Sequence, residues 1–362
     1  AQPTCGVVKA ASLRMGFGTA SEVLQTRLQT LCDLQAPGKE LENHYKVGDV
    51  IGEGRFSKVY AAVRAKDESH VALKEIDQVA LEEDEEALEM LEAEVIALRR
   101  ASGAAHVVKL HEVVAADDAV WLCMERVPGR ELFELVEQRG ALPNAMVCSL
   151  MTQLLTALEA LARLGVVHRD VKPENMMVSE LDDAPPRLTL IDFGYAAVLV
   201  TGDGEGAMLS GVAGSPEYAA PEVLSWLEVE ADETGTAVGE PYDAGCDVWS
   251  VGVTAHVLLS AELPFDLPED CSEESLVAAA RSAKLTFRRP EWSGDGMASA
   301  RDFVTQCMSV VREERPTAAD LLGHPWVSPN GRPRPKVVNE AYLEMLEETV
   351  QVETAKLRVS DE

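Results

Sequence analysis

Two polar stretches of the sequence, each placed directly after an apolar run, carry side chains suited to phosphoryl transfer. The first begins at His168 and contains Asp170, an acceptor for a hydroxyl proton, and Lys172, a compact cation. Asn175 closes this stretch and Asp192 opens the second, and the oxygens of these two side chains suit Mg²⁺. Phosphoryl transfer requires a carboxylate that orients a nucleophile, together with a metal and a lysine that spread charge on the moving phosphate.

The order and spacing of these residues resemble the catalytic loop and the metal-binding loop of eukaryotic protein kinases. The triplets His-Arg-Asp and Asp-Phe-Gly begin at His168 and Asp192, in the family's order. Either triplet alone would be weak evidence, but both together with Lys172 and Asn175 in place are specific. The resemblance implies a catalytic set made of Asp170, Lys172, Lys74, Asn175 and Asp192, in which Asn175 and Asp192 hold the metal.

A glycine-rich segment precedes these motifs and resembles the kinase loop Gly-x-Gly-x-x-Gly-x-Val. Glycines let backbone N–H groups approach phosphate oxygens without a Cβ in the way. Ser57 stands where the third glycine usually lies, which puts the flexibility of the loop in question and not nucleotide binding. An ordinary hairpin turn would be the alternative if the segment stood alone. The ATP-binding residues implied here are Ile51, Gly52, Glu53, Gly54, Arg55, Phe56, Ser57, Lys58 and Val59.

Several strands are expected around this loop. Residues 45–76 are interpreted as three strands, and 107–114 and 119–125 predict two more. The sequence Val-Ala-Leu-Lys, which ends at Lys74, resembles the kinase strand that carries the phosphate-binding lysine. On an alternating strand Lys74 would point into the cleft and pair with the α- and β-phosphates. The resemblance also places Ala72 in the nucleotide site.

Residues 81–100 form an acidic helix pattern, with apolar residues at three- and four-residue spacing, Leu88, Leu91, Val95 and Leu98. The end of this pattern resembles the end of the family's αC helix. We therefore assign Glu94 as the partner of Lys74, with Glu92 and Glu89 as rivals because the helix offers several carboxylates. Such an ion pair would fix the position of the lysine and need not add much stability.

The segment 121–127 resembles the hinge between the two lobes of a kinase. The resemblance implies that Met124 lies behind the adenine ring of ATP. It also implies that the backbone of Glu125 and of Val127 hydrogen-bonds the adenine edge, and it adds Met177 to the nucleotide site.

Acidic residues near the cleft predict a preference for basic substrates. In the resemblance Glu131 meets the ribose and, in kinases of basic substrates, an arginine of the substrate. Glu174 joins both the ATP-binding and the substrate-binding sets. The segment 214–222 resembles the activation and P+1 segments that bind the peptide, and Ser215 together with Lys172 favours serine or threonine as the acceptor.

Other matches imply the scaffold of the kinase fold. Glu222 would pair with Arg315 as a buried anchor, and Asp247 would bond the backbone of the catalytic loop. The apolar residues of 146–164 predict a core helix. The closing stretch 321–327 and the Gly-Ser-Pro-Glu-Tyr sequence resemble most the calcium/calmodulin-dependent kinase group.

The resemblance implies the α+β class: a bilobal protein kinase fold with a small β-rich N-lobe, one αC helix, and a larger, mainly helical C-lobe. An extension at 1–44 carries one amphipathic helix, with Val23, Leu24, Leu28, Leu31 and Leu34 at helical spacing. That helix packs on the body of the domain or, alternatively, binds a partner or regulates the enzyme. The expected divisions are 1–44, the kinase domain 45–327 (N-lobe 45–124, hinge 125–130, C-lobe 131–327), and a tail at 328–362 with an acidic helix.

The composition limits the partners. The chain has 362 residues, a formal net charge of −30 and a sequence pI near 4.6. Such charge argues against nucleic acid or an anionic membrane as partner. It suits protein substrates with basic Ser/Thr sites, although charge runs that are only solvated faces are an equal alternative. No apolar run reaches the roughly 18 residues that span a bilayer, and polar residues interrupt the longest candidate, 248–259.

The seven cysteines are scattered, odd in number and without Cys-x-x-Cys spacing. This pattern predicts reduced thiols in a cytosol-like compartment, so we expect a cytoplasmic protein. Because the sequence begins at Ala1, a targeting segment removed by processing would leave no trace, and an organelle or the nucleus stays an alternative.

The tail has a basic stretch at 332–336 and an acidic helix pattern at 339–358. Calmodulin targets are basic and amphipathic, so calmodulin binding is not expected. We expect a monomer. The implied cofactors are ATP and Mg²⁺, with Mn²⁺ as an alternative ion.

Regulation and rival functions stay open at this point. Arg169 beside Asp170 usually implies control by a phosphorylated activation segment, yet Gly211 stands at the usual acceptor position. Either Ser210 substitutes, with Thr201 more distant, or the segment is ordered without phosphate. A catalytically impaired, kinase-like nucleotide-binding scaffold is the alternative function. A small-molecule kinase is a second rival, against which the peptide-binding segment 215–222 argues.

Overall fold

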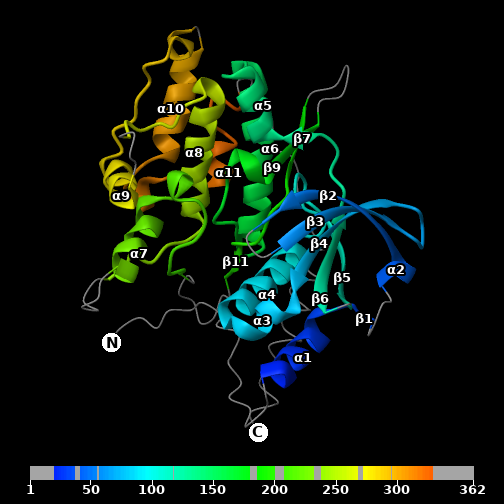
Figure 1. Ribbon diagram of the computed structural model, residues 1–362. Helices are drawn as coiled ribbons and strands as arrows, with labels where there is room; N and C mark the ends of the chain where they lie inside the picture. The colour runs from blue at the N-terminus through cyan, green and yellow to red at the C-terminus, as the bar shows by residue number, and fades with distance from the viewer. Residues whose placement is uncertain are drawn as a thin grey trace.

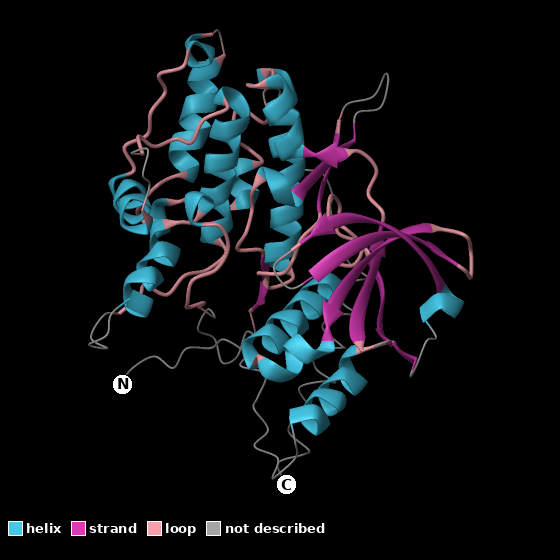
Figure 2. Ribbon diagram, in the orientation of Figure 1, coloured by secondary structure: helices cyan, strands magenta, loops and turns pink. Residues whose placement is uncertain are grey.

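A computed structural model describes residues 20–36, 41–54, 57–116, 118–179, 186–199, 208–231, 238–267, 272–294 and 296–328. Two lobes lie side by side, one built mainly of strands and the other of helices (Figures 1 and 2). The α+β, bilobal class expected from the sequence is confirmed. The expectations for Arg55, Phe56, Thr201 and the tail segments 332–336 and 339–358 lie outside the described residues.

The small lobe is built on a six-stranded sheet in the order β1-β5-β6-β4-β3-β2. Its strands are β1 (Leu34–Ala36), β2 (Tyr45–Glu53), β3 (Ser57–Arg64), β4 (His70–Asp77), β5 (Leu110–Ala116) and β6 (Ala119–Glu125). All neighbours pair antiparallel except β1, which pairs in parallel with β5. The five antiparallel strands agree with the sequence, whereas β1 was not expected because three residues give too short a pattern.

Helices cover the sheet on one side, where α1 (Ala20–Leu31) lies beside α3 (Gln78–Glu83) and α4 (Glu85–Arg100) in Figure 1. A four-residue helix, α2 (Leu41–His44), precedes β2. The prediction of a single helix over 81–100 is wrong at its beginning, because helix α3 ends before Asp84 and helix α4 begins after it. The Asp84 carboxylate accepts hydrogen bonds from the backbone N–H groups of Glu86 and Ala87 and so caps α4. Helix α4 occupies the place of αC.

The large lobe contains α5 (Leu132–Arg139), α6 (Asn144–Arg163), α7 (Pro221–Ala231), α8 (Gly245–Ser260), α9 (Glu273–Ser282), α10 (Met297–Cys307) and α11 (Ala318–Leu321). At its centre α8 packs against α6 and α10. In the described part of the chain α6 is the one helix long and apolar enough to cross a membrane. Leu150, Met151 and Leu154 of α6 are nevertheless fully buried inside the lobe, so its apolar character is that of a core helix.

The acidic composition of segment 225–241 predicts a solvated loop, but the segment begins as helix. Helix α7 continues to Ala231, and the hydroxyl of Ser225 donates to the carbonyl of Glu222 and accepts from the N–H of Glu240. The indole of Trp226 also donates to the carbonyl of Glu240. These bonds tie the two ends of the segment together.

Candidate active site

Short strands present the loop that carries Asp170. The loop lies between β8 (Val166–Val167) and β9 (Met176–Ser179); β8 pairs with β11 (Ala197–Val198), and β9 lies between β7 (Arg130–Glu131) and β10 (Arg187–Leu190). The buried carboxylate of Asp247 accepts from the N–H of His168 at 2.8 Å and from that of Arg169 at 2.7 Å. Burial raises the pKa of Asp247, whereas these hydrogen bonds and the nearby positive charge act in the opposite direction. Arg169 has a φ of 65°, a strained conformation that these bonds hold in place.

Three predicted residues meet around the Asp170 carboxylate. Asn175 donates to Asp170 Oδ2 at 2.7 Å, and Lys172 Nζ lies 3.0 Å from the same oxygen. The N–H of Ser215 donates to Asp170 Oδ1 at 2.9 Å, and Lys172 Nζ donates to Ser215 Oγ at 2.6 Å. The preceding Gly214 has a φ of +79°, and an added Cβ would lie 2.1 Å from the Arg169 carbonyl oxygen. The P+1 segment is therefore held directly against the catalytic loop.

A second cluster joins the two lobes across the cleft. Lys74 Nζ lies 2.6 Å and 2.9 Å from the two carboxylate oxygens of Glu94, and 3.4 Å from Asp192 Oδ1. The structure thus pairs Lys74 with Glu94 and not with Glu92 or Glu89. Burial alone would lower the pKa of Lys74, but the charges of Glu94 and Asp192 outweigh it and hold that pKa above its usual value. Lys74 consequently stays cationic at neutral pH.

Asp192 has a carboxylate that is both ionised and accessible. The charge of Lys74 lowers the pKa of Asp192, and the N–H of Gly194 donates to Oδ1 at 3.0 Å. Its side chain is 46% exposed, in contrast to the buried Glu94.

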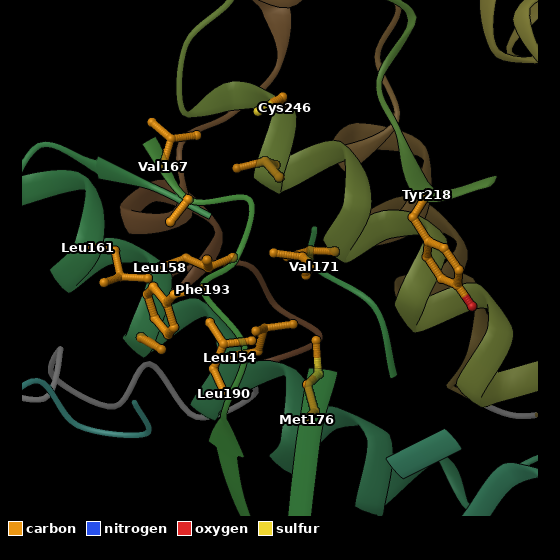
Figure 3. Close-up of a cluster of buried hydrophobic side chains, with 14 of the residues drawn as sticks. Leu154, Leu158, Leu161, Val167, Val171, Met176, Leu190, Phe193, Tyr218 and Cys246 are labelled. Atoms are coloured by element: carbon orange, nitrogen blue, oxygen red, sulfur yellow. The ribbon is translucent and has the colours of Figure 1, made fainter. Parts of the chain in front are cut away.

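A cluster of buried apolar side chains packs against both loops (Figure 3). Phe193 is fully buried among Leu158, Leu161 and Leu190, and its ring meets the edge of the His168 ring at 4.9 Å between centroids. Burial lowers the pKa of His168, so this imidazole is neutral and packs as part of the core.

Asn175 and Asp192 fit a hard divalent cation, because both supply oxygen ligands and the loops that carry them are hydrogen-bonded to each other. The N–H of Ile191 donates to the carbonyl of Asn175 at 3.0 Å. In the described part of the chain no group of three or more His, Cys, Asp or Glu could hold a metal ion. A pair of oxygen ligands is still typical of magnesium, which keeps waters and uses substrate phosphates to complete its coordination.

Several of the predicted nucleotide residues lie on neighbouring strands of the small-lobe sheet. In the sheet register Lys74 of β4 lies opposite Val59 of β3, and Ala72 lies opposite Met124 of β6. Met124 is buried, whereas the side chain of Glu125 is exposed. The glycine-rich hairpin is closed by the N–H of Gly54, which donates to the Ser57 carbonyl at 2.8 Å; this turn joins β2 to β3.

The predicted substrate carboxylates lie on neighbouring elements, Glu131 at the end of β7 and Glu174 just before β9. Burial raises the pKa of Glu131, and the charges of Glu134 and Glu174 raise it further. Burial likewise raises the pKa of Glu174. Glu174 Oε2 is buried and accepts no hydrogen bond from any described residue.

Tyr242, which no sequence pattern singled out, holds the activation segment. Its backbone N–H and C=O pair with those of Leu209, and its hydroxyl donates to the carbonyl of Gly211 at 3.0 Å. Arg169 donates to the Tyr195 carbonyl at 2.7 Å and to the Tyr242 hydroxyl at 3.3 Å. The guanidinium that would otherwise meet a phosphate therefore already has protein partners.

The structure also forms the expected anchor at the base of this segment. Arg315 donates to both carboxylate oxygens of Glu222, at 2.6 Å and 3.1 Å, and also to the carbonyls of Gly245 and Ser309. Both side chains of the pair are almost completely buried, with 0% and 5% exposed.

Comparison with known proteins gives one family and many relatives. The protein kinase domain family matches residues 45–327. The chain is 34% identical over 291 residues to the calcium/calmodulin-dependent protein kinase type 1 of Macrobrachium nipponense, covering 80% of this chain and 76% of the relative. It is 34% identical over 296 residues to the same-named protein of Caenorhabditis elegans, covering 82% and 77%. The serine/threonine-protein kinase DCLK3 of Mus musculus is 32% identical over 288 residues, covering 80% and 33%.

Proposed function

Because the chain belongs to the protein kinase family, in the calcium/calmodulin-dependent group of serine/threonine kinases, we propose that it transfers the γ-phosphoryl group of ATP to serine or threonine hydroxyls of proteins. Two groups of residues carry this proposal: the ion-pair cluster Lys74–Glu94–Asp192 and the hydrogen-bonded group Asp170–Lys172–Ser215. Both halves of a phosphoryl-transfer site, one for phosphates and one for the acceptor, are present in the same cleft.

Each residue then has a distinct task. Asp170 orients the acceptor hydroxyl and takes its proton as the hydroxyl oxygen forms a bond to the γ-phosphorus. The bond between the γ-phosphorus and the β–γ bridging oxygen breaks, and ADP leaves with that electron pair. Lys172 neutralises charge on the moving group, and Lys74, fixed by Glu94, positions the α- and β-phosphates. Magnesium held by Asn175 and Asp192 would neutralise charge on the phosphate oxygens.

Assembled in this way, the site accelerates transfer chiefly by positioning and by electrostatic stabilisation. Asp170, Lys172 and Ser215 are already joined by hydrogen bonds, which supports a preorganised acceptor site.

The test offers one basic peptide in three forms that differ only in the acceptor, Ser, Thr or Tyr, with labelled MgATP. We expect label on the Ser and Thr forms and very little on the Tyr form, because Lys172 and Ser215 together favour an aliphatic hydroxyl. Nucleotide binding without transfer to any of the three would instead support the scaffold function.

We also expect a preference for arginine upstream of the acceptor, since Glu131 and the unpartnered Glu174 Oε2 supply negative charge in the cleft. Glu131→Gln should raise the KM of an arginine peptide about tenfold, which corresponds to losing about 1.4 kcal/mol of charge-assisted binding. The KM of a matched alanine peptide should be unchanged. An equal KM effect on both peptides would refute the assignment.

The raised pKa values of Glu131 and Glu174 add a pH signature. On lowering the pH these carboxylates take up protons earlier than an ordinary glutamate, so the KM of the arginine peptide should rise, and Glu131→Gln should flatten this rise. The same raised pKa also makes the stability of the fold depend on pH. A carboxyl whose pKa is higher in the folded protein than in the unfolded chain makes the folded state less stable as the pH rises through that pKa. Glu131→Gln should therefore raise the melting temperature slightly at neutral pH, measured by thermal unfolding.

The contacts of Arg169 and Tyr242 support a regulation in which the activation segment is ordered without being phosphorylated. Ser210→Ala is expected to keep kcat within about twofold of the parent, which is as small as the usual effect of a substitution away from special structural features. Tyr242→Phe, which removes the hydroxyl between Arg169 and Gly211, should lower kcat more. A large loss in Ser210→Ala, matched by phosphatase treatment of the parent, would show that Ser210 must be phosphorylated.

A further inference from the structure

Residues 20–36 precede the segment that matches the kinase family, yet they pack against the helix that carries Glu94. Leu24, Leu28 and Leu31 of α1 are 1%, 0% and 6% exposed and belong to the same buried cluster as Leu81 of α3 and Leu91 of α4. Figure 1 shows α1 beside α3 and α4, below the edge of the sheet. These three leucines of α1 are thus buried in this contact.

Polar contacts fix this packing at a defined point of α4. The guanidinium of Arg27 makes a two-pronged pair with Glu92, with Nε 2.6 Å from Oε1 and Nη2 2.5 Å from Oε2. The two side chains are only 21% and 15% exposed. A bidentate, partly buried pair of this kind is stronger and more directional than an ordinary surface ion pair.

Glu92 and Glu94 are two residues apart on one helix, so their side chains leave it roughly 200° apart. Glu94 points to Lys74 of the sheet, while Glu92 points to Arg27 of α1. The helix is consequently held from two opposite sides, by the catalytic lysine on one and by the N-terminal segment on the other.

The C-terminal end of α4 is tied to the same segment. Arg99 Nη2 donates to the Leu31 carbonyl at 2.7 Å and to Asp33 Oδ1 at 2.9 Å. Asp33 also accepts from the N–H of Val113 at 2.8 Å and donates its own N–H to the Val113 carbonyl at 2.8 Å. Directly after it, β1 pairs with β5. Asp33 therefore links α4 to the edge of the sheet.

We propose that residues 20–36 form a built-in clamp that sets the position of α4, with Arg27 and Asp33 as positioning residues that keep Glu94 at Lys74. The inference rests on the proposed function and deepens it, because the lysine–glutamate pair must be formed for phosphoryl transfer and the position of its helix is what controls the pair. The clamp adds contacts from residues 20–36 to those that α4 makes with α3, β5 and β11.

The test uses the full chain and charge reversal at one pair: Arg27→Glu, Glu92→Arg and the double variant. Each single variant places like charges together, and we expect kcat/KM for ATP to fall about tenfold, within the usual range of coupling between sites. Both a lower kcat and a higher KM for ATP should contribute, because fewer molecules hold Lys74 in place. The double variant restores an opposite pair and the parent's net charge, and should recover most of the loss.

Two measurements separate an effect on the position of α4 from an effect on overall stability or on net charge. Hydrogen exchange of amides 85–100 should be faster in both single variants and return towards the parent in the double variant. Arg289→Glu serves as the matched control, since Arg289 pairs with Glu262 on the surface with about half of each side chain exposed, and it should change neither readout. Asp33→Ala, which lies outside the helix, should reproduce the faster exchange and the rise in KM.

Each outcome decides one question. Parent-like exchange over 85–100 in both single variants overturns the clamp, whether or not the parent phosphorylates peptides. Failure of the double variant to recover also overturns it, because a specific pair must be restorable by reversal. Faster exchange in the single variants of a protein that transfers no phosphate keeps the clamp and refutes the proposed function instead.

Discussion

Replacing Asp170 with alanine is expected to lower kcat for peptide phosphorylation by about 10²–10⁴-fold, the usual effect of removing a positioned general base. The affinity for MgATP should change little, because Lys74, Glu94 and Asp192 form a separate cluster of ion pairs. Turnover is measured with a saturating Ser peptide, and nucleotide affinity is measured by direct binding.

Asp266→Ala is the matched control for this loss. Asp266 is an exposed carboxylate paired with Arg288 on the surface of the large lobe, so its removal should leave both kcat and nucleotide affinity unchanged. Near-normal turnover in Asp170→Ala would remove Asp170 from the chemistry. A parallel loss of ATP binding would show that the substitution disturbs the cleft as a whole.

Arg315→Ala is expected to have the largest effect on stability, because it leaves the carboxylate of Glu222 buried without its partner. Removing one member of a buried ion pair typically costs about 3–5 kcal/mol of the free energy of unfolding. The loss here includes hydrogen bonds to the carbonyls of Ser309 and Gly245, and contact of the guanidinium with the Trp249 ring at 5.4 Å.

Urea unfolding followed by tryptophan fluorescence measures this effect, with Arg289→Ala as the exposed counterpart. Removing Arg289 from its surface pair should cost far less, because water and salt screen an exposed ion pair. If the two variants lost similar free energy, the Glu222–Arg315 pair would not be the anchor of the activation segment.

The catalytic residues were predictable because their spacing is local. Asp170, Lys172 and Asn175 share one loop between two short strands, and Asp192 follows the next strand, so a short pattern contains nearly all of the geometry. The strand that carries Lys74 was also predictable, because alternation along a strand sets the register of a sheet.

Contacts between segments far apart in the sequence were harder to predict. Glu94 was chosen among three acidic residues by resemblance alone, whereas the structure gives a physical reason: Glu92 is occupied by Arg27, which lies 65 positions earlier. Tyr242 was missed because its role depends on the path of the activation segment, which brings Gly211 to its hydroxyl. The strand β1 was missed because it exists only through its pairing with β5.

The apolar spacing and composition of the sequence also could not show where short helices begin and end. Apolar spacing continues through Asp84, and only the capping bonds of its carboxylate show that one helix ends and another begins there. In the same way, acidic composition suggested a loop from Ser225 onward, but the buried hydroxyl of Ser225 and the indole of Trp226 hold a helical turn. Tertiary hydrogen bonds overrode composition in both places.

The central claim is that this cleft transfers phosphate, and one single-turnover measurement tests it most directly. Parent protein and Asp192→Ala are each mixed with labelled MgATP and excess basic Ser peptide, and label on the peptide is followed with time. The account predicts transfer by the parent and almost none by Asp192→Ala, although both stay folded. No transfer by parent protein that binds ATP, or equal transfer by the two proteins, would contradict it.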